Sequence, residues 1–405
     1  MNSSHIARTQ QPAIRLVHHI TLVIGLVCVG IGQTLLYTIL GPASRIIGIS
    51  EFGVGIIVTT AALIITLCSG LWGKIIFRVG SRNAYLSGMI FYAVGTLSLA
   101  LALKFCLNHI ISATTAFLML LLIRCLTGAL TAGIHPAAMT YISETTSKIE
   151  RGPGMALIAS AYSIGAVIGP LLGSSLGSVS IALPLYIAAG MAFFGTLAGY
   201  FILKPETKRE KEKTKKKNAI KITDRRVFPV FIGISCTYMA FSAFQQTISF
   251  YIQDVYSLKE DIAIKQTGIT VSLMALMMIL IQLFYIQIMK PDTKKLLHIG
   301  SALTMLGFLL LIFSREHIVT SYFSAGLLGA GFGMMIPAMQ SSASLAVSKE
   351  EQGGVAGFLF GASAFGYVIG PVLGTLIYSS SPIYLFSIGI VTIFIAMFFA
   401  RKSIN

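Results

Sequence analysis

The chain has 405 residues, of which 55% are hydrophobic and 11% are charged, and its mean hydropathy is +0.83. This composition excludes an ordinary globular enzyme, whose surface needs about twice that share of charged residues, and indicates a polytopic membrane protein. The formal net charge of +16 invites a nucleic-acid partner. The positive residues lie mainly in alternate loops, however, as the positive-inside rule requires of a membrane protein.

Twelve apolar runs are each long enough to cross about 30 Å of hydrocarbon as a helix. In chain order they are 18–40, 53–76, 84–105, 114–138, 154–177, 181–203, 228–251, 267–289, 296–314, 319–342, 354–377 and 382–400. We therefore predict an all-α protein with twelve transmembrane helices. The first run is too long for the core of a signal peptide and has no small-x-small cleavage pattern, so we expect it to span the membrane.

The positive residues predict the orientation of these helices. With the N-terminus inside, the inner segments carry 24 Lys or Arg, whereas the outer loops carry five. We therefore expect both termini to be cytoplasmic. The segment 204–226 holds eleven Lys or Arg and four acids. It predicts a solvated linker that attracts anionic lipid, between an N-terminal half, 1–203, and a C-terminal half, 227–405.

The fourth run contains Arg124, the one charged residue well inside a predicted span. Burying an unneeded Arg costs about 2.5–3.5 kcal/mol, so Arg124 is a functional candidate unless it reaches the outer surface. His135 lies eleven residues later, about three helical turns, and should project from nearly the same face. A titrating imidazole could respond to a proton gradient. The alternative is a neutral His that bonds a carbonyl freed by Pro136.

The fifth run contains 165-GAVIGPLLGS-174, in which Gly165, Gly169 and Gly173 share one helix face and Pro170 adds a place to bend. Each Gly would cost about 1 kcal/mol in a soluble helix, but in lipid small residues let helices pack closely. A shift of 201 residues aligns 148–173 with 349–374, with eleven identities in 26 positions. The repeated set is Gly366, Gly370, Pro371 and Gly374.

This alignment indicates an internal duplication, and parallel six-helix repeats are typical of transporters whose two halves rock. We predict a packing seam at which helices five and eleven slide or seal as the halves move, with a binding site near the midplane between the halves. The five cysteines have no metal-ligand spacing, and no HExxH, Walker or GxSxG motif occurs. We therefore predict no metal, no cofactor and no enzymatic activity.

Twelve spans in two related halves, a basic central segment and the GxxxGPxxG pattern at 165–173 together resemble the major facilitator superfamily. The pattern in helix five resembles that of its proton-coupled drug-export branch, and 124-RCLTG-128 resembles a further pattern of the family. The resemblance implies two rocking halves and export by proton exchange. It covers essentially the whole chain.

The segment 73-GKIIFRVGSR-82 resembles the family's GxxxDRxGxR pattern, except that Phe77 replaces the aspartate. The resemblance implies that the matching residues help to latch a cytoplasmic gate, with Glu144 as a substitute acid for Arg78 or Arg82; alternatively, the positive residues only fix the topology. The predicted gating residues are Gly73, Arg78, Gly80, Arg82 and Glu144.

Helix seven carries a polar stripe, and one polar face in lipid should look into protein or water. In the resembled fold the first, fourth, seventh and tenth helices line the cavity. The predicted cavity residues are Gln33, Tyr37, Tyr238, Phe241, Ser242, Gln245, Gln246, Ser249, Gln340 and Ser341, with further walls at Phe244, Met334 and Met335. Alternatively, each polar residue taken alone could form a hydrogen bond between helices. Aromatic and Met walls with few charges suit amphipathic ligands.

No carboxylate lies inside a predicted span, although Glu51, Glu144 and Asp254 are near the ends of spans. Proton coupling is therefore expected at Arg124 and His135, with Asp254 or Glu51 as alternatives. We predict a monomeric, proton-coupled exporter of a small amphipathic molecule, either drug-like or a metabolite or siderophore-type compound, in a bacterial cytoplasmic membrane. One alternative is an importer or facilitator of a small metabolite, for which Arg124 would be the counter-ion if the metabolite is anionic. Another is a receptor or assembly factor without transport activity.

Overall fold

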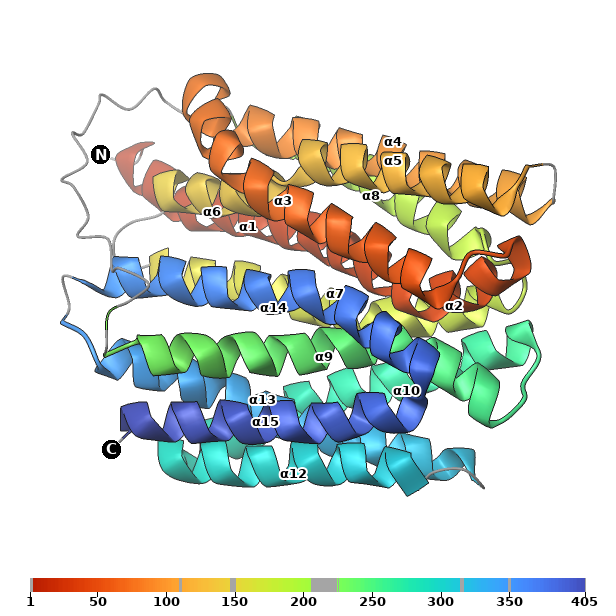
Figure 1. Cartoon of the computed structure of the whole chain (residues 1–405). Coiled ribbons are helices and arrows are strands. Elements are labelled where there is room, and N and C mark those ends of the chain that lie inside the picture. The colour runs from red at the N-terminus through yellow and green to blue at the C-terminus, as the bar shows by residue number, and fades with distance from the viewer. Residues whose placement is uncertain are drawn as a thin grey trace.

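The structure is a computed structural model that describes residues 3–108, 111–145, 151–204, 224, 226–313, 317–348 and 351–404. Within these ranges every regular element is a helix (Figure 1). The elements are α1 (Ser3–Thr34), α2 (Leu36–Ile47), α3 (Glu51–Val79), α4 (Ser81–Leu107), α5 (Ala113–Thr131), α6 (Ile134–Thr145), α7 (Arg151–Gly177), α8 (Leu183–Ile202), α9 (Phe228–Val255), α10 (Glu260–Leu280), η1 (Ile281–Ile286), α11 (Gln287–Met289), α12 (Thr293–Phe313), α13 (Ile318–Leu345), α14 (Gln352–Ser380) and α15 (Pro382–Ile404). The predicted all-α fold is confirmed.

The predicted number of spans is also confirmed. Within the described residues, eleven helical stretches are long and apolar enough to cross a membrane. The twelfth is α7, a helix of 27 residues whose apolar part in that search is the shorter stretch Ile164–Gly177. The predicted linker 204–226 falls almost entirely outside the described residues.

The fourth predicted span, 114–138, is not one continuous helix. The indole Nε1 of Trp72 donates to the carbonyl of Ala129 at 2.8 Å, the acceptor that the N–H of Gly133 would use in an uninterrupted helix. Pro136 has no N–H to donate to the carbonyl of Ala132. The chain therefore turns between α5 and α6.

Two other spans are interrupted. Between α1 and α2, the hydroxyl of Thr34 donates to the Gly30 carbonyl at 2.8 Å and that of Thr38 to the Leu35 carbonyl at 2.6 Å. Such local bonds compete with the helix ladder and bend helices. The eighth span continues from α10 through the π-helical turn η1 into α11. A π-turn inside an α-helix is uncommon and often marks a functional position.

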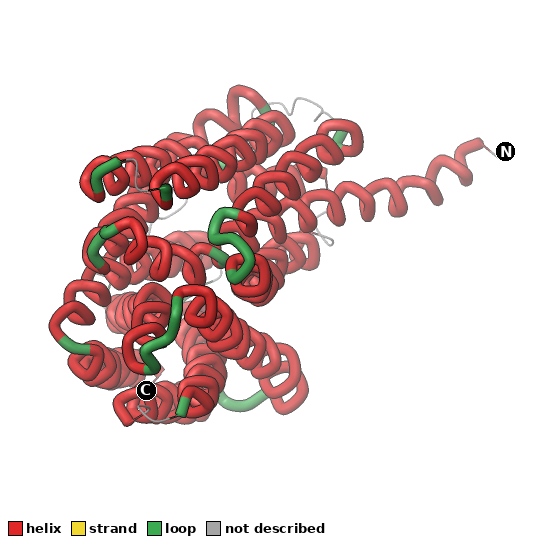
Figure 2. Tube along the Cα trace, turned by 90° about the vertical axis from the view of Figure 1, so that its right-hand side faces the viewer, coloured by secondary structure: helices red, strands yellow, loops and turns green. Residues whose placement is uncertain are grey.

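The two halves lie side by side as bundles of roughly parallel helices joined by short loops (Figures 1 and 2). The N-terminal half comprises α1–α8 and the C-terminal half α9–α15. Both chain termini lie at one end of the bundle, the termini end, and we call the opposite end the far end (Figure 1). Across the boundary between halves, α3 packs on α14, α10 packs on α7, and α2 packs on both α9 and α10.

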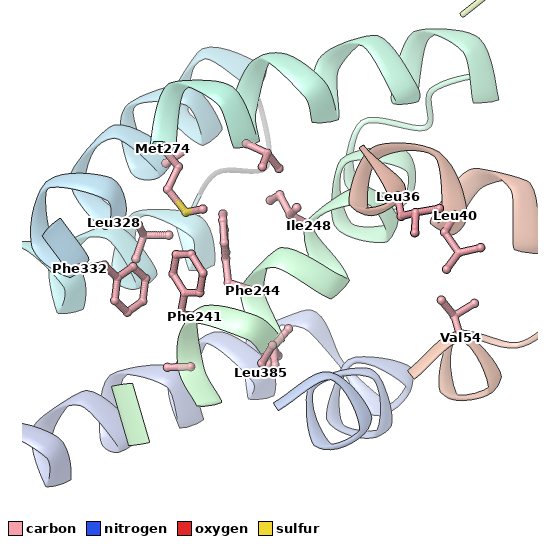
Figure 3. Close-up of a cluster of buried hydrophobic side chains, with 14 of the residues drawn as sticks. Leu36, Leu40, Val54, Phe241, Phe244, Ile248, Met274, Leu328, Phe332 and Leu385 are labelled. Carbon is pink, nitrogen blue, oxygen red and sulfur yellow. The ribbon is translucent and has the colours of Figure 1, made fainter. Parts of the chain in front are cut away.

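The buried core shows where the halves are joined. One apolar cluster crosses the boundary, with Leu36, Leu40 and Val54 from the N-terminal half and Ile248 and Met274 from the C-terminal half (Figure 3). A second cluster contains only residues of the N-terminal half, nearer the termini end. The shared core therefore holds the halves together toward the far end.

The glycines of the predicted seam do pack closely, but inside each half. A Cβ on Gly165 would lie 2.7 Å from the Val27 carbonyl oxygen, and one on Gly169 would lie 2.6 Å from that of Ile31, so both glycines face α1. Gly173 faces Leu35, in the turn after α1. Small residues allow this approach because no side chain separates the two backbones.

The repeated glycines do the same in the C-terminal half. Cβ atoms on Gly366 and Gly370 would lie 2.6 Å from backbone oxygens of α9, and one on Gly374 would lie 2.8 Å from the Cβ of Ala243. The prediction that this seam forms the sliding surface between halves is therefore wrong, because the glycine faces of α7 and α14 are turned toward their own half. Pro170 and Pro371 lie inside these two helices.

The glycines at the boundary between halves are different ones. A Cβ on Gly55 of α3 would lie 2.1 Å from Oγ1 of Thr375 and 3.0 Å from the Pro371 carbonyl oxygen. A Cβ on Gly268 of α10 would lie 2.0 Å from the Cβ of Ser174 and 2.7 Å from the carbonyl oxygen of Pro170. The contacts of α3 with α14 and of α10 with α7 therefore share one feature, a glycine that packs against the helical turn containing the repeated proline.

Candidate transport site

A cavity of about 250 Å³ lies between the halves at the level where α1 meets α2. The C-terminal half supplies most of its wall through α9, α10, η1, α13 and α14. Its described lining residues are Thr34, Ala166, Tyr238, Phe241, Gln245, Met274, Ala275, Met278, Ile279, Gln282, Ile336 and Tyr367. None of these side chains carries a charge at neutral pH.

The polar groups of the cavity are two amides, two phenols and a threonine hydroxyl. The rings of Tyr238 and Tyr367 lie 5.2 Å apart, and Phe241 meets Tyr367 edge to face at 6.1 Å. Gln245 projects from α9 and Gln282 from the π-turn η1. An aromatic wall with a few hydrogen-bonding groups suits a flat or amphipathic ligand without a fixed counter-charge.

Three of the predicted cavity residues, Tyr238, Phe241 and Gln245, line this cavity. The other polar members of the stripe on α9 lie in helix contacts. Ser242 is fully buried and donates to the Gly366 carbonyl at 3.1 Å, and both Gln246 and Ser249 are buried. The stripe therefore covers more than one face of α9, and only one of these faces meets the cavity.

The predicted residues of helices one and ten lie outside this cavity. Gln33 and Tyr37 are partly buried, whereas Gln340 and Ser341 are exposed. The predicted walls Phe244, Met334 and Met335 are buried in helix packing.

Sequence reasoning missed Thr34, Gln282 and Tyr367. The sequence held a signal for two of these residues. Gln282 is an isolated amide inside an apolar run, and Tyr367 aligns with Ala166 under the 201-residue shift.

Arg124 lies away from this cavity, in the N-terminal half. It borders a small void together with Tyr92, Thr96 and Thr127, and its buried Nε has no hydrogen-bond partner among the described residues. His135 is exposed on α6. Two turn residues separate the helix of Arg124, α5, from that of His135, α6, so the expected shared face stays a prediction.

The predicted gating residues make contacts within their own half. Arg82 donates to the carbonyls of Tyr200 at 2.7 Å and Leu203 at 2.5 Å, and so binds the C-terminal end of α8. Glu144 accepts a hydrogen bond from Ser81 at 2.8 Å. Gly73 and Arg78 are exposed, and Gly80 turns the chain with φ +88°. At the position of the family's aspartate, Phe77 is 76% exposed.

A charged cluster joins the halves at the far end. One guanidinium nitrogen of Arg45, on α2, donates to Asp254, on α9, at 2.8 Å, and its other terminal nitrogen also contacts that carboxylate. The same guanidinium donates to Glu51, at the start of α3, at 2.8 Å. It lies 5.2 Å from the ring centroid of Phe250. The hydroxyl of Tyr378 donates to Asp254 at 2.5 Å.

A second ion pair lies at the termini end, within the C-terminal half. Arg226 donates to both carboxylate oxygens of Glu351, at 2.8 and 3.1 Å, and also to Asp224. Its hydrogen bonds hold the pKa of Glu351 down, at about 2, and lower the pKa of Asp224. This pair connects the start of α9 to the start of α14 without crossing between halves.

The chain resembles known transporters over most of its length. The sequence profile of the Major Facilitator Superfamily matches residues 22–291 and 290–403. Multidrug resistance protein 2 of Bacillus subtilis (strain 168) is 24% identical over 362 residues, covering 86% of this chain and 85% of that protein. The class C tetracycline resistance protein of Escherichia coli is 24% identical over 343 residues, covering 81% of this chain and 80% of that protein.

Solved structures share the fold. One is a bacterial homologue of the human lysosomal transporter Spinster, in an inward-facing and unoccupied conformation. It has a TM-score of 0.72 at 12% identity and covers 97% of this chain and 98% of that chain.

Proposed function

This chain belongs to the Major Facilitator Superfamily, and from that premise we propose that it exports a small amphipathic organic molecule in exchange for protons. The observation that carries the proposal is the cavity between the halves, which has an aromatic and Met-rich wall and no charged lining residue. A site of this kind holds ligands by shape and stacking, and it tolerates a range of them.

The arrangement of the halves indicates which side of the transporter is closed. We place both termini in the cytoplasm, because the loops at that end carry most of the Lys and Arg. The far end, where the halves share a core and the Arg45–Asp254 pair, then faces the exterior. An exporter collects cargo and an importer releases it with the outer side closed, so the proposed direction rests on the relatives described above.

Two relatives agree with this cargo class. Their names concern multidrug and tetracycline resistance, so tetracycline is a reasonable first probe, in a bacterial cytoplasmic membrane. Import of an anionic metabolite has less support, since Arg124, its expected counter-ion, does not line the cavity.

Flux in proteoliposomes tests the proposal. Purified protein is reconstituted with tetracycline inside, and tetracycline release is followed with and without an acidic exterior. Export by exchange predicts release that depends on the gradient and that falls at least tenfold in Gln245→Leu, because the apolar side chain keeps the volume but loses the amide. Release that ignores both the gradient and Gln245→Leu would overturn the proposal for this cargo.

The same assay tests the residues predicted from sequence. If His135 or Arg124 carries the coupling, His135→Ala or Arg124→Ala abolishes gradient-driven release while exchange of internal for external tetracycline at equal pH continues. Full gradient-driven release in both variants would exclude these two residues as the coupling site.

A further inference from the structure

Exchange against protons requires a group that gains a proton on one side and loses it on the other, and the polar groups along the outer half of α9 are suited to this. We propose that the carboxylate of Asp254 is the proton-binding site and that a hydrated path along α9 connects it to the central cavity. This inference rests on the proposed function. It gives that function its coupling site.

The position of Asp254 links its charge to closure of the far end. Arg45 belongs to the N-terminal half and Asp254 to the C-terminal half, so their ion pair can form only when the outer ends meet. When the outer ends part, the carboxylate loses the guanidinium and faces the exterior, where it can take up a proton. The neutral acid no longer attracts the guanidinium as a charge.

Two hydrogen-bond donors from different helices face the carboxylate in the closed state. Arg45 faces it from α2 and Tyr378 from α14, both as hydrogen-bond donors. Glu51, at the start of α3, binds the other side of the guanidinium. Four other charged residues lie nearby in the chain, at or just before the start of α10, and all are exposed to solvent: Lys259, Glu260, Asp261 and Lys265.

A proton bound only at the outer surface would return to the exterior, so net exchange needs a way inward. Gln246, Ser249 and Gln253 follow one another at helical spacing along α9, between Asp254 and the cavity residue Gln245. A side-chain oxygen of each is buried without a hydrogen-bond partner among the described residues. Buried oxygens of this kind are normally satisfied by water.

A neighbouring helix adds a fourth such oxygen. Thr267 of α10 is fully buried, and its hydroxyl also has no partner in the described structure. It lies seven residues from the outer end of α10, about 10 Å, and Ser249 lies six residues from that of α9, about 9 Å. The two helices pack on each other and both contact α2, and the two unsatisfied hydroxyls lie at a similar distance from the outer ends of their helices.

The proton balance is then complete. When the far end is open, an external hydronium ion gives its proton to an oxygen of Asp254, leaving neutral acid and water. When the halves close, Arg45 recovers the carboxylate, and the proton passes to a water of the path. It leaves as hydronium through the cavity, and no other co-reactant is needed.

The distance between the outer ends of the two halves tests both the proton site at Asp254 and the path along α9, without any cargo. Thr114→Cys and Ile262→Cys place labels on exposed far-end positions of opposite halves, in a chain whose five native cysteines are replaced by alanine. In proteoliposomes an impermeant spin label marks only molecules whose far end faces outward, and double electron–electron resonance gives the populations with open and closed outer ends.

If Asp254 is the proton site, the open population of the far end depends on the external pH, and Asp254→Asn removes this dependence. In the parent, the open-to-closed ratio rises as the external pH falls from about 6 to about 3, the range in which aspartates ordinarily titrate, by at most tenfold per pH unit for one linked proton. In Asp254→Asn the open population is high at both pH values and insensitive to pH. The matched control Glu351→Gln breaks an Arg–carboxylate pair that lies within one half, and it keeps the parent response. A parent-like response in Asp254→Asn would refute the site.

The path predicts a response to the internal pH. With the exterior at about pH 3.5, raising the internal pH from about 3.5 to about 7 drains the proton inward and lowers the open population of the parent. Ser249→Ala and Gln246→Leu lose this internal response yet keep the external one. If both variants follow the internal pH as the parent does, the path is wrong even if Asp254 is the proton site. Flux of tetracycline plays no part here, so failure of this proposal and failure of the exporter proposal are separate results.

Discussion

Gly268→Ala should open the far end of the protein without unfolding it. The added Cβ would lie 2.0 Å from the Cβ of Ser174 and 2.7 Å from the backbone oxygen of Pro170. Since α10 and α7 belong to different halves, this overlap exists only while the outer ends are closed. The substitution therefore penalises one conformation rather than the fold.

The size of the shift follows from the cost of overpacking. An extra methyl group in a well-packed interface costs about 1–3 kcal/mol. Applied to the closed state alone, this changes the ratio of open to closed molecules by about 5- to 150-fold. If about 3% of the molecules were open in the parent, about 13% would be open at the low end of this range and about 80% at the high end.

Double electron–electron resonance between Thr114→Cys and Ile262→Cys measures this ratio directly. The matched control is Gly190→Ala on α8, where an added Cβ would meet no atom within 4 Å, and its distances should equal those of the parent. If Gly268→Ala folds normally and still shows the parent's far-end distances, then the contact between α10 and α7 is not one that opens, and this account of the boundary fails.

Three further predictions concern stability. Gly169→Ala should lower the thermal unfolding temperature at every pH, by an overpacking cost of about 1–3 kcal/mol, because its Cβ would meet the Ile31 backbone inside one half; unchanged melting would contradict this packing. Arg124→Gln should raise the melting temperature by removing an intramembrane cation that costs about 2.5–3.5 kcal/mol; a lower value would reveal a stabilising partner. The pKa of Glu351 is held at about 2, below its ordinary value of 4.5. The contribution of the charged carboxylate to the free energy of unfolding is therefore complete above pH 4.5 and is lost as the pH falls through about 2, and Glu351→Gln removes it. The difference in melting temperature from the parent should therefore stay constant between pH 5 and 8, and a difference that shrinks across that range would contradict the ion pair.

The fold was predictable from the sequence because it depends on hydrophobic length and on duplication. A run such as 84–105 must lie in a helix that satisfies its backbone groups, whatever its neighbours are. The interruptions were not predictable in the same way. The break before α6 depends on Trp72, which is 57 residues away from Ala129 in the chain and takes its carbonyl. Only the packed structure brings that competitor to the helix.

The site was predictable in part for a related reason. Polar residues inside an apolar helix must face protein or water, and Tyr238 and Gln245 do line a cavity. The same rule cannot distinguish a cavity from a helix contact, and Ser242 belongs to the latter. Arg124 and His135 were linked by assuming one unbroken helix, whereas a short turn separates α5 from α6.

Glycine spacing by itself does not say which surface moves. The repeated glycines at every fourth position mark the tightest packing, where a Cβ would strike backbone on α1 or α9. A surface packed that tightly within one half is suited to stay assembled, since separating it would expose backbone groups to lipid. Gly55 and Gly268 have no such spacing, yet each faces the opposite half at the turn of a repeated proline. The glycines that face the opposite half lie on several different helices, so they leave little pattern in the sequence and are found only when the halves are seen together.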